Sequence, residues 1–145
     1  MKKQVAIIGG GTASLFLASF LDSNLFEVTI FEQKAALGRK FLVAGDGGFN
    51  LTHSENLADF KSRYTPTSFL SDALSSFSNE NLRSWLLEIG IPTFVGTSGR
   101  VFPEKGIKPI TVLKSIERYL ISKNVTFKFK KTFTGWDSED NPVLN

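Results

Sequence analysis

Residues 5–14 read VAIIGGGTAS, and this stretch decides the fold of the chain. The run VAII is apolar without alternation, as is typical of a strand buried on both faces of a parallel sheet. Behind the three glycines, Leu15, Ala18 and Leu21 have the spacing of one face of a helix. A second apolar run, VTIF at 28–31, ends on Glu32. The sequence therefore predicts a strand, a glycine turn, a helix and a parallel strand, in that order.

Individual positions of this βαβ unit point to a nucleotide. Gly9 lets the chain leave the strand in a sharp turn. Gly11 lets a diphosphate approach the unpaired N–H groups at the start of the helix. Glu32 lies about 20 residues beyond the glycines, where a carboxylate accepts hydrogen bonds from a ribose and repels a 2′-phosphate. Ser14 stands where the usual pattern has Gly or Ala. We expect dinucleotide binding; the alternative is an α/β domain whose tight turn binds nothing.

Composition excludes several other classes of function. With 145 residues, 41% hydrophobic and 21% charged, the chain has the make-up of a globular domain. It has no cysteine, which excludes disulfides and thiolate metal sites, and we expect no metal. The net charge of +3 is spread along the chain apart from Lys128, Lys130 and Lys131, so we expect no nucleic-acid partner. Without a long apolar run or a signal peptide, we expect a cytoplasmic protein that does not bind membranes.

The rest of the chain extends this unit into a Rossmann-like α/β domain. We place the core unit at 4–32, an aperiodic glycine-rich loop at 33–54, an insertion at 55–108, a helix and third strand at 109–130, and the start of a meander at 132–145. The insertion contains helices with apolar faces at 69–77 and 82–89, and a hairpin at 93–102. The strand at 125–129 gives a mostly parallel sheet of order 3-2-1, with the later strands missing.

Side chains that could do chemistry are few. His53 is the only histidine, and beside Thr52 and Ser54 it is more typical of a cap or loop contact than of a catalytic base. No serine–histidine–acid set, metal-ligand cluster or pair of carboxylates stands out. A bound cofactor would supply the chemistry in such a protein, and the catalytic residues stay unknown.

Two further motifs resemble a known family. Glu32 followed after five residues by Gly38-Arg39 resembles the FAD signature of glutathione-reductase-type flavoproteins. The runs GRKF at 38–41, AGDGGFNLTHSE at 44–55 and GRVFP at 99–103 are similar to the bacterial YhiN-like flavoproteins, also called the aminoacetone-oxidase family of NAD(P)/FAD-dependent oxidoreductases. The resemblance covers essentially the whole chain and implies a Rossmann-like FAD/NAD(P)-binding domain.

The resemblance implies FAD as cofactor, with NAD(P)H as a co-substrate of the full-length protein. It places the glycine turn at the pyrophosphate, Glu32 at the adenosine ribose, Arg39 and Lys40 beside the adenosine or phosphates, and Asn50 and Thr52 beside the flavin. The cofactor-binding residues implied in this way are Gly9, Gly10, Gly11, Thr12, Ala13, Ser14, Glu32, Gln33, Arg39, Lys40, Gly45, Asn50 and Thr52.

Members of this family are more than twice as long as this chain. We therefore expect the FAD-binding portion of a flavoprotein oxidoreductase that is truncated, inactive alone, and completed by a C-terminal portion or a second chain. Its first strand, left at the edge of the sheet, invites self-association. An NAD-binding Rossmann domain and a non-enzymatic nucleotide-binding module remain the alternatives.

Overall fold

The computed structural model describes residues 1–43 and 49–145. The chain forms two compact units, one of residues 1–44 and 113–145 and the other of residues 45–112, and we describe each by itself. The first contains the predicted βαβ unit, and the second contains the whole of the predicted insertion at 55–108. Of the candidate site residues, Gly45 lies outside the described part of the chain.

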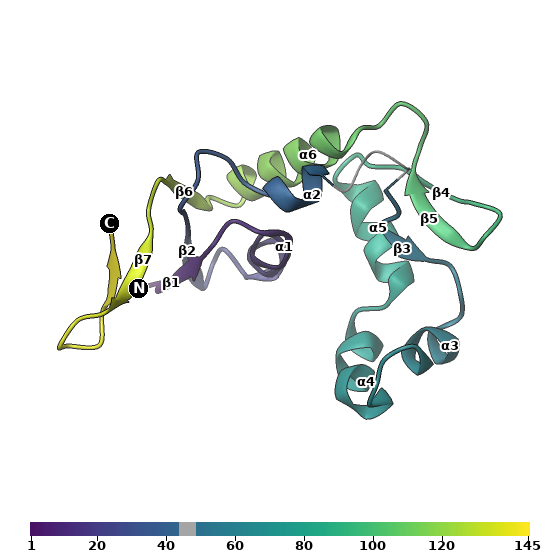
Figure 1. Cartoon of the computed structure of the whole chain (residues 1–145), viewed down its shortest axis with the longest axis horizontal. Helices are drawn as coiled ribbons and strands as arrows, with labels where there is room; N and C mark the ends of the chain where they lie inside the picture. Colours follow the sequence, from purple (N-terminus) through teal and green to yellow (C-terminus); the bar gives the residue numbers. More distant parts are fainter. Residues whose placement is uncertain (44–48) are drawn as a thin grey trace. The chain divides into compact units, whose positions relative to one another are not determined.

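The sheet of the first unit is parallel and has the predicted order (Figure 1). Strand β2 (Phe26–Glu32) lies between β1 (Lys3–Ile8) and β6 (Thr126–Phe129). The register aligns Ile7 with Ile30 on one side and Ile30 with Phe127 on the other. The Rossmann-like α/β fold and the 3-2-1 order are therefore confirmed.

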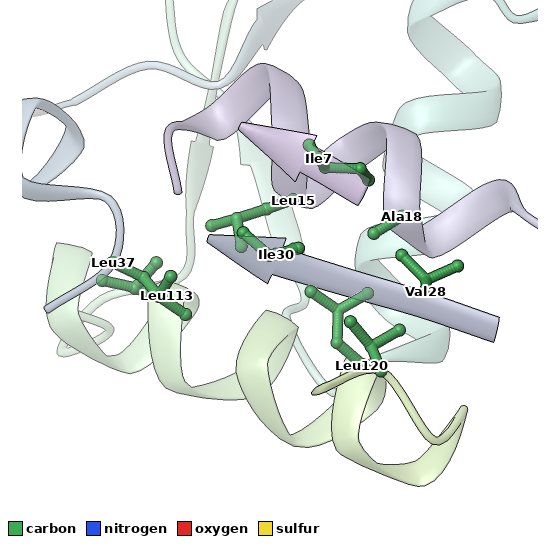
Figure 2. Close-up of a cluster of buried hydrophobic side chains, with 9 residues drawn as sticks. Ile7, Leu15, Ala18, Val28, Ile30, Leu37, Leu113 and Leu120 are labelled. Atoms are coloured by element: carbon green, nitrogen blue, oxygen red, sulfur yellow. The ribbon is translucent and has the colours of Figure 1, made fainter. Parts of the chain in front are cut away.

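Two helices cover one face of this sheet. Helix α1 (Thr12–Phe20) contributes Leu15 and Ala18, and α6 (Pro109–Ser122) contributes Leu113 and Leu120. These side chains surround Ile30 of the central strand, which is fully buried (Figure 2). The remaining buried members of this core are Ile7, Val28, Leu37 and Val125. Apolar burial on this face is the main stabilising contribution to the unit.

The opposite face corrects one prediction from the sequence. Ala6 and Ile8 of β1 are exposed, Ile8 to 44%, although the VAII run predicts burial on both faces. Both helices pack on the face of Ile7, and the core that they form does not include Ala6 or Ile8. An uninterrupted apolar run therefore does not indicate which of the two faces of a strand is buried.

The second unit joins three helices to a small antiparallel sheet. Its helices are α3 (Leu57–Ser62), α4 (Thr67–Ser76) and α5 (Asn79–Glu88), and its strands are β3 (Thr52–His53), β4 (Thr93–Val95) and β5 (Arg100–Pro103). Strand β5 is central, in the order β3-β5-β4. The predicted hairpin is present, and Gly90, which follows α5 and its C-cap Ile89, has a φ of +82° that suits a glycine after a helix.

Two expectations for residues 33–89 need correction. The segment 33–54 is not wholly aperiodic, because it contains the short helix α2 (Arg39–Val43) and strand β3. The predicted helix at 69–77 is present as α4, but it has no buried residue and Phe69 is 78% exposed. The apolar spacing therefore identified the helix correctly, but the apolar face that it predicted is not buried. By contrast, α5 buries Trp85 and Leu86 as its pattern indicates.

The chain ends in an antiparallel hairpin of β7 (Phe133–Trp136) and β8 (Pro142–Leu144). Asp137 closes its turn by accepting hydrogen bonds from the backbone N–H groups of Asn141 and Glu139, which lower the pKa of this carboxyl. None of the helices in the described ranges is both long and apolar enough to cross a bilayer.

Candidate functional site

The glycine turn ends with backbone N–H groups that no described side chain caps. Gly9 has a φ of +93° and donates its N–H to the carbonyl of Phe31 at 2.7 Å, which fixes the turn to β2. Gly11 is the N-cap of α1 in an extended conformation, with no side-chain cap among the described residues and no acid in the first turn. The first N–H groups of a helix have no partner within it. They leave an electropositive site for an anion.

Glu32 turns its carboxylate toward this site. Its Oε2 accepts the N–H of Gly10 at 2.6 Å, and its Oε1 accepts the N–H of Lys34 at 2.7 Å. The side chain is half-buried at the end of β2. A carboxylate held by two backbone donors keeps a fixed position, and its remaining lone pairs can accept ribose hydroxyls.

The neighbouring glycines of the turn have different surroundings. A Cβ on Gly10 would lie 2.5 Å from Cδ2 of Leu37 and 3.1 Å from Oε2 of Glu32, whereas a Cβ on Gly9 or Gly11 would meet nothing within 4 Å. Gly10 is therefore required by packing inside the protein. Gly9 and Gly11 border open space that a ligand could occupy.

Leu37 and Gly38, in the loop after β2, contact the glycine turn. Gly38 donates its N–H to the carbonyl of Gly10 at 2.8 Å, has a φ of +58°, and would place a Cβ 2.7 Å from Leu113. Leu37 is buried against the turn. Sequence reasoning missed Leu37; its one signal is that it is a lone large apolar residue directly before Gly38. The pair joins α6 and the glycine turn into one packed unit.

The other candidate residues of the first unit lie around the turn. Thr12 and Ala13 are exposed and Ser14 is half-buried, all in the first turn of α1. Gln33 is exposed directly after Glu32. Arg39 and Lys40 are exposed at the start of α2, which follows Gly38. The structure thus gathers the glycines, Glu32 and the start of α1 in one place.

Asn50 and Thr52 belong to the second unit. Asn50 is exposed, and Thr52 is half-buried opposite Val101 of β5. The glycine turn belongs to the other unit. Their role beside a flavin stays a prediction.

His53 acts as a loop contact in this structure. Its Nδ1 accepts the N–H of Glu55 at 3.2 Å, so Nε2 carries the proton and donates to the carbonyl of Ser98 at 3.1 Å. The ring also packs on Gly99, where a Cβ would lie 2.6 Å from Cε1. Both ring nitrogens are thus engaged with backbone. This geometry favours the structural interpretation of His53 over a catalytic one.

Side chains from the helices fix the segment that follows His53. Asn79, only 3% exposed, donates from Nδ2 to the carbonyls of His53 at 2.7 Å and Glu55 at 2.9 Å. Arg63 donates from Nε to Oε1 of Glu55 at 2.7 Å, and this hydrogen bond lowers the pKa of the Glu55 carboxyl. Together they hold β3 and the chain after it in one conformation.

No group of three or more His, Asp or Glu side chains gathers as metal ligands in the portion of the chain that the structure covers. The glycine turn and Glu32 together offer backbone donors for a diphosphate and a carboxylate for a sugar.

The chain is similar to a known domain family and to a curated protein. The model of the HI0933-like protein Rossmann domain matches residues 3–145. The ribosomal RNA dihydrouridine synthase of Haemophilus influenzae is 34% identical over 110 residues, which are 75% of this chain and 27% of that protein. The chain thus spans about a quarter of the length of this curated relative.

Solved structures share the fold at low identity. A 3-ketosteroid-delta4-(5alpha)-dehydrogenase from Rhodococcus jostii has a TM-score of 0.63 and 11% identity, over 98% of this chain and 44% of that one. THI4 of Thermovibrio ammonificans has a TM-score of 0.58 and 17% identity, over 99% of this chain and 45% of that one. At these identities the likeness concerns the fold alone.

Proposed function

Because this chain belongs to the HI0933-like Rossmann domain family of FAD-dependent oxidoreductases, we propose that its glycine turn and Glu32 bind the adenosine diphosphate half of FAD. The family and FAD as its cofactor, both predicted from the sequence, are confirmed. The roles of individual residues are our proposal. They rest on how well the described residues fit the cofactor.

The observation that carries the proposal is the meeting of Glu32 with the glycine turn. A pyrophosphate would accept hydrogen bonds from the N–H groups at the start of α1, where Gly11 leaves open space. The adenosine ribose would donate to the carboxylate of Glu32, which the N–H of Gly10 already holds at the turn. Arg39 and Lys40 would add positive charge near the phosphates.

FAD, when bound, supplies electron or hydride transfer through its flavin ring. The residues of this chain bind and orient the cofactor, and we assign no catalytic side chain. Asn50 and Thr52 would contact the flavin side. For the whole protein we keep the prediction that a further portion or a second chain adds the substrate site, that NAD(P)H is a co-substrate, and that this chain alone is inactive.

For the substrate, we propose a uridine base in ribosomal RNA, which the whole protein would reduce. The reason is the curated relative at 34% identity, which is named a ribosomal RNA dihydrouridine synthase. The spread of charge along the sequence led us to expect no nucleic-acid partner. The proposal of an RNA substrate replaces that expectation. Cytoplasmic location, which suits an enzyme of ribosomal RNA, stays part of the proposal.

The test is FAD titration followed by flavin fluorescence. Replacing Glu32 by Gln removes the charge that holds the ribose and should weaken FAD binding about tenfold. Glu27→Gln is the matched control, because it removes an exposed carboxylate from the same strand. Equal FAD affinity of the Glu32→Gln and Glu27→Gln variants would contradict the assignment of Glu32.

A further inference from the structure

We propose that four lysines at the carboxyl end of β2 and β6 form a phosphate-binding surface that contacts the RNA substrate. They are Lys34, Lys128, Lys130 and Lys131, here called the lysine patch. The inference rests on the proposed RNA substrate and adds the surface that would bind it.

Backbone hydrogen bonds gather these lysines from distant parts of the sequence. Lys130 donates its N–H to the carbonyl of Lys34 at 3.3 Å, and Lys131 donates to the carbonyl of Glu32 at 3.0 Å. Lys128 precedes them on β6, opposite Phe31. The sequence shows a group of three lysines, and the fold adds Lys34 as a fourth.

The charge of the lysine patch is not neutralised within the described chain. All four lysines are exposed, and none forms an ion pair with a described residue. The carboxylate nearest to them along the backbone, Glu32, has both oxygens hydrogen-bonded to N–H groups. An uncompensated group of cations attracts polyanions.

Positive charge is also divided unevenly between the two units. Residues 1–44 and 113–145 contain eleven Lys and Arg against seven Asp and Glu, a net charge of +4. Residues 45–112 contain six against seven, a net charge of −1. The chain's whole positive excess therefore lies in the unit that contains the lysine patch.

Aromatic rings interleave with these lysines, which favours nucleic acid over other polyanions. Lys128 lies 5.4 Å from the ring centroid of Phe31, and Phe129, between Lys128 and Lys130, is 37% exposed. Single-stranded nucleic acids bind grooves that combine cations for the backbone with aromatic side chains for the bases. Residues 126–131 read TFKFKK, so lysines alternate with phenylalanines at the end of β6, and Phe129 is the exposed ring.

The test compares two double variants of the whole 145-residue chain. Lys130→Gln with Lys131→Gln removes two charges from the lysine patch, and Lys105→Gln with Lys108→Gln removes two exposed lysines from the other unit. Binding of a fluorescein-labelled RNA hairpin with uridine in its loop is measured over a salt series. FAD titration of each variant reports the cofactor site independently.

We expect the patch variant to bind RNA about tenfold more weakly than the wild type at low salt. Its plot of log affinity against log salt should be less steep by about 1.4, as two lost phosphate contacts predict. The control variant should bind RNA like the wild type. Patch-dependent RNA binding without FAD binding would support the surface while contradicting the cofactor proposal.

Four results would overturn the inference. The first is FAD binding without RNA binding by the wild type. The second is an equal RNA affinity of the two variants. The third is a loss of FAD affinity in the patch variant alone, which would assign the lysines to the cofactor. The fourth is patch-dependent binding to phosphatidylserine vesicles and not to RNA.

Discussion

At the scale of single residues, Gly10 and Gly11 have different roles: Gly10 is constrained by packing inside the protein, and Gly11 borders the proposed cofactor site. Gly10→Ala places a Cβ against Leu37 and should cost about 1–3 kcal/mol of unfolding free energy through overpacking. Gly11→Ala meets open space and, as an N-cap change, should cost at most about 1 kcal/mol, but it should weaken FAD binding. Chemical denaturation and FAD titration of both variants measure the two effects.

Shortening Leu37 provides the control for this pair. In the double variant Gly10→Ala with Leu37→Ala, the added methyl has room, so the two changes should cost less together than the sum of their separate costs. If the costs simply add, Leu37 is not what excludes a side chain at Gly10.

At the scale of elements, α5 stabilises β3 through one buried amide. Asn79→Ala leaves the carbonyls of His53 and Glu55 without their donor and should cost about 2 kcal/mol or more. Asn81→Ala is the matched control, because on the same helix it removes only the half of the capping box that the Asn81 side chain forms with the N–H of Ser78, worth at most about 1 kcal/mol. Denaturant unfolding of both variants would disprove the role of Asn79 if the control were the more destabilised.

The ion pair after β3 makes the stability of this unit depend on pH. Arg63 lowers the pKa of Glu55 below its ordinary value of 4.5, so the folded state favours the ionised carboxylate. The resulting stabilisation is fully present above that value and is lost as the pH falls through the lower pKa of the folded state.

Stability measured from neutral to acid pH checks this dependence. The difference in unfolding free energy between wild type and Glu55→Gln should be constant near neutral pH and shrink in acid. Glu80→Gln, which removes an exposed carboxylate of α5, controls for the change in net charge. A wild-type advantage that persisted unchanged in strong acid would rule out the pair as its source.

These elements also show what the sequence could reveal. The βαβ unit and α5 follow from apolar spacing within one segment, so their positions were accessible to sequence reasoning. Strand β3 has only two residues and exists through pairing with β5, far along the chain. Likewise, the contact of Leu37 with Gly10 arises from folding, and no local pattern encodes it. Glu32 was accessible because a strand's end fixes where its side chain lies.

At the scale of the whole molecule, the open edge and face of the parallel sheet are its least protected features. Strand β1 has a neighbour on one side only within the described sheet, and its Ala6 and Ile8 are exposed. A pocket of about 240 Å³ lies on this face, with Gln4, Ala6 and Phe31 among its lining residues. Backbone groups along an uncovered edge can pair with a strand of another copy.

We therefore expect the 145-residue chain to self-associate at micromolar concentration. Ala6→Lys places a charge on the open face beside the edge and should shift the mass measured by light scattering toward that of the monomer, because charged side chains oppose strand pairing. Ser84→Lys adds the same charge to an exposed position of α5 and should leave the association unchanged. A monodisperse monomer of the wild-type chain would show that the edge of β1 does not pair, and an equal effect of both lysines would assign the association to net charge.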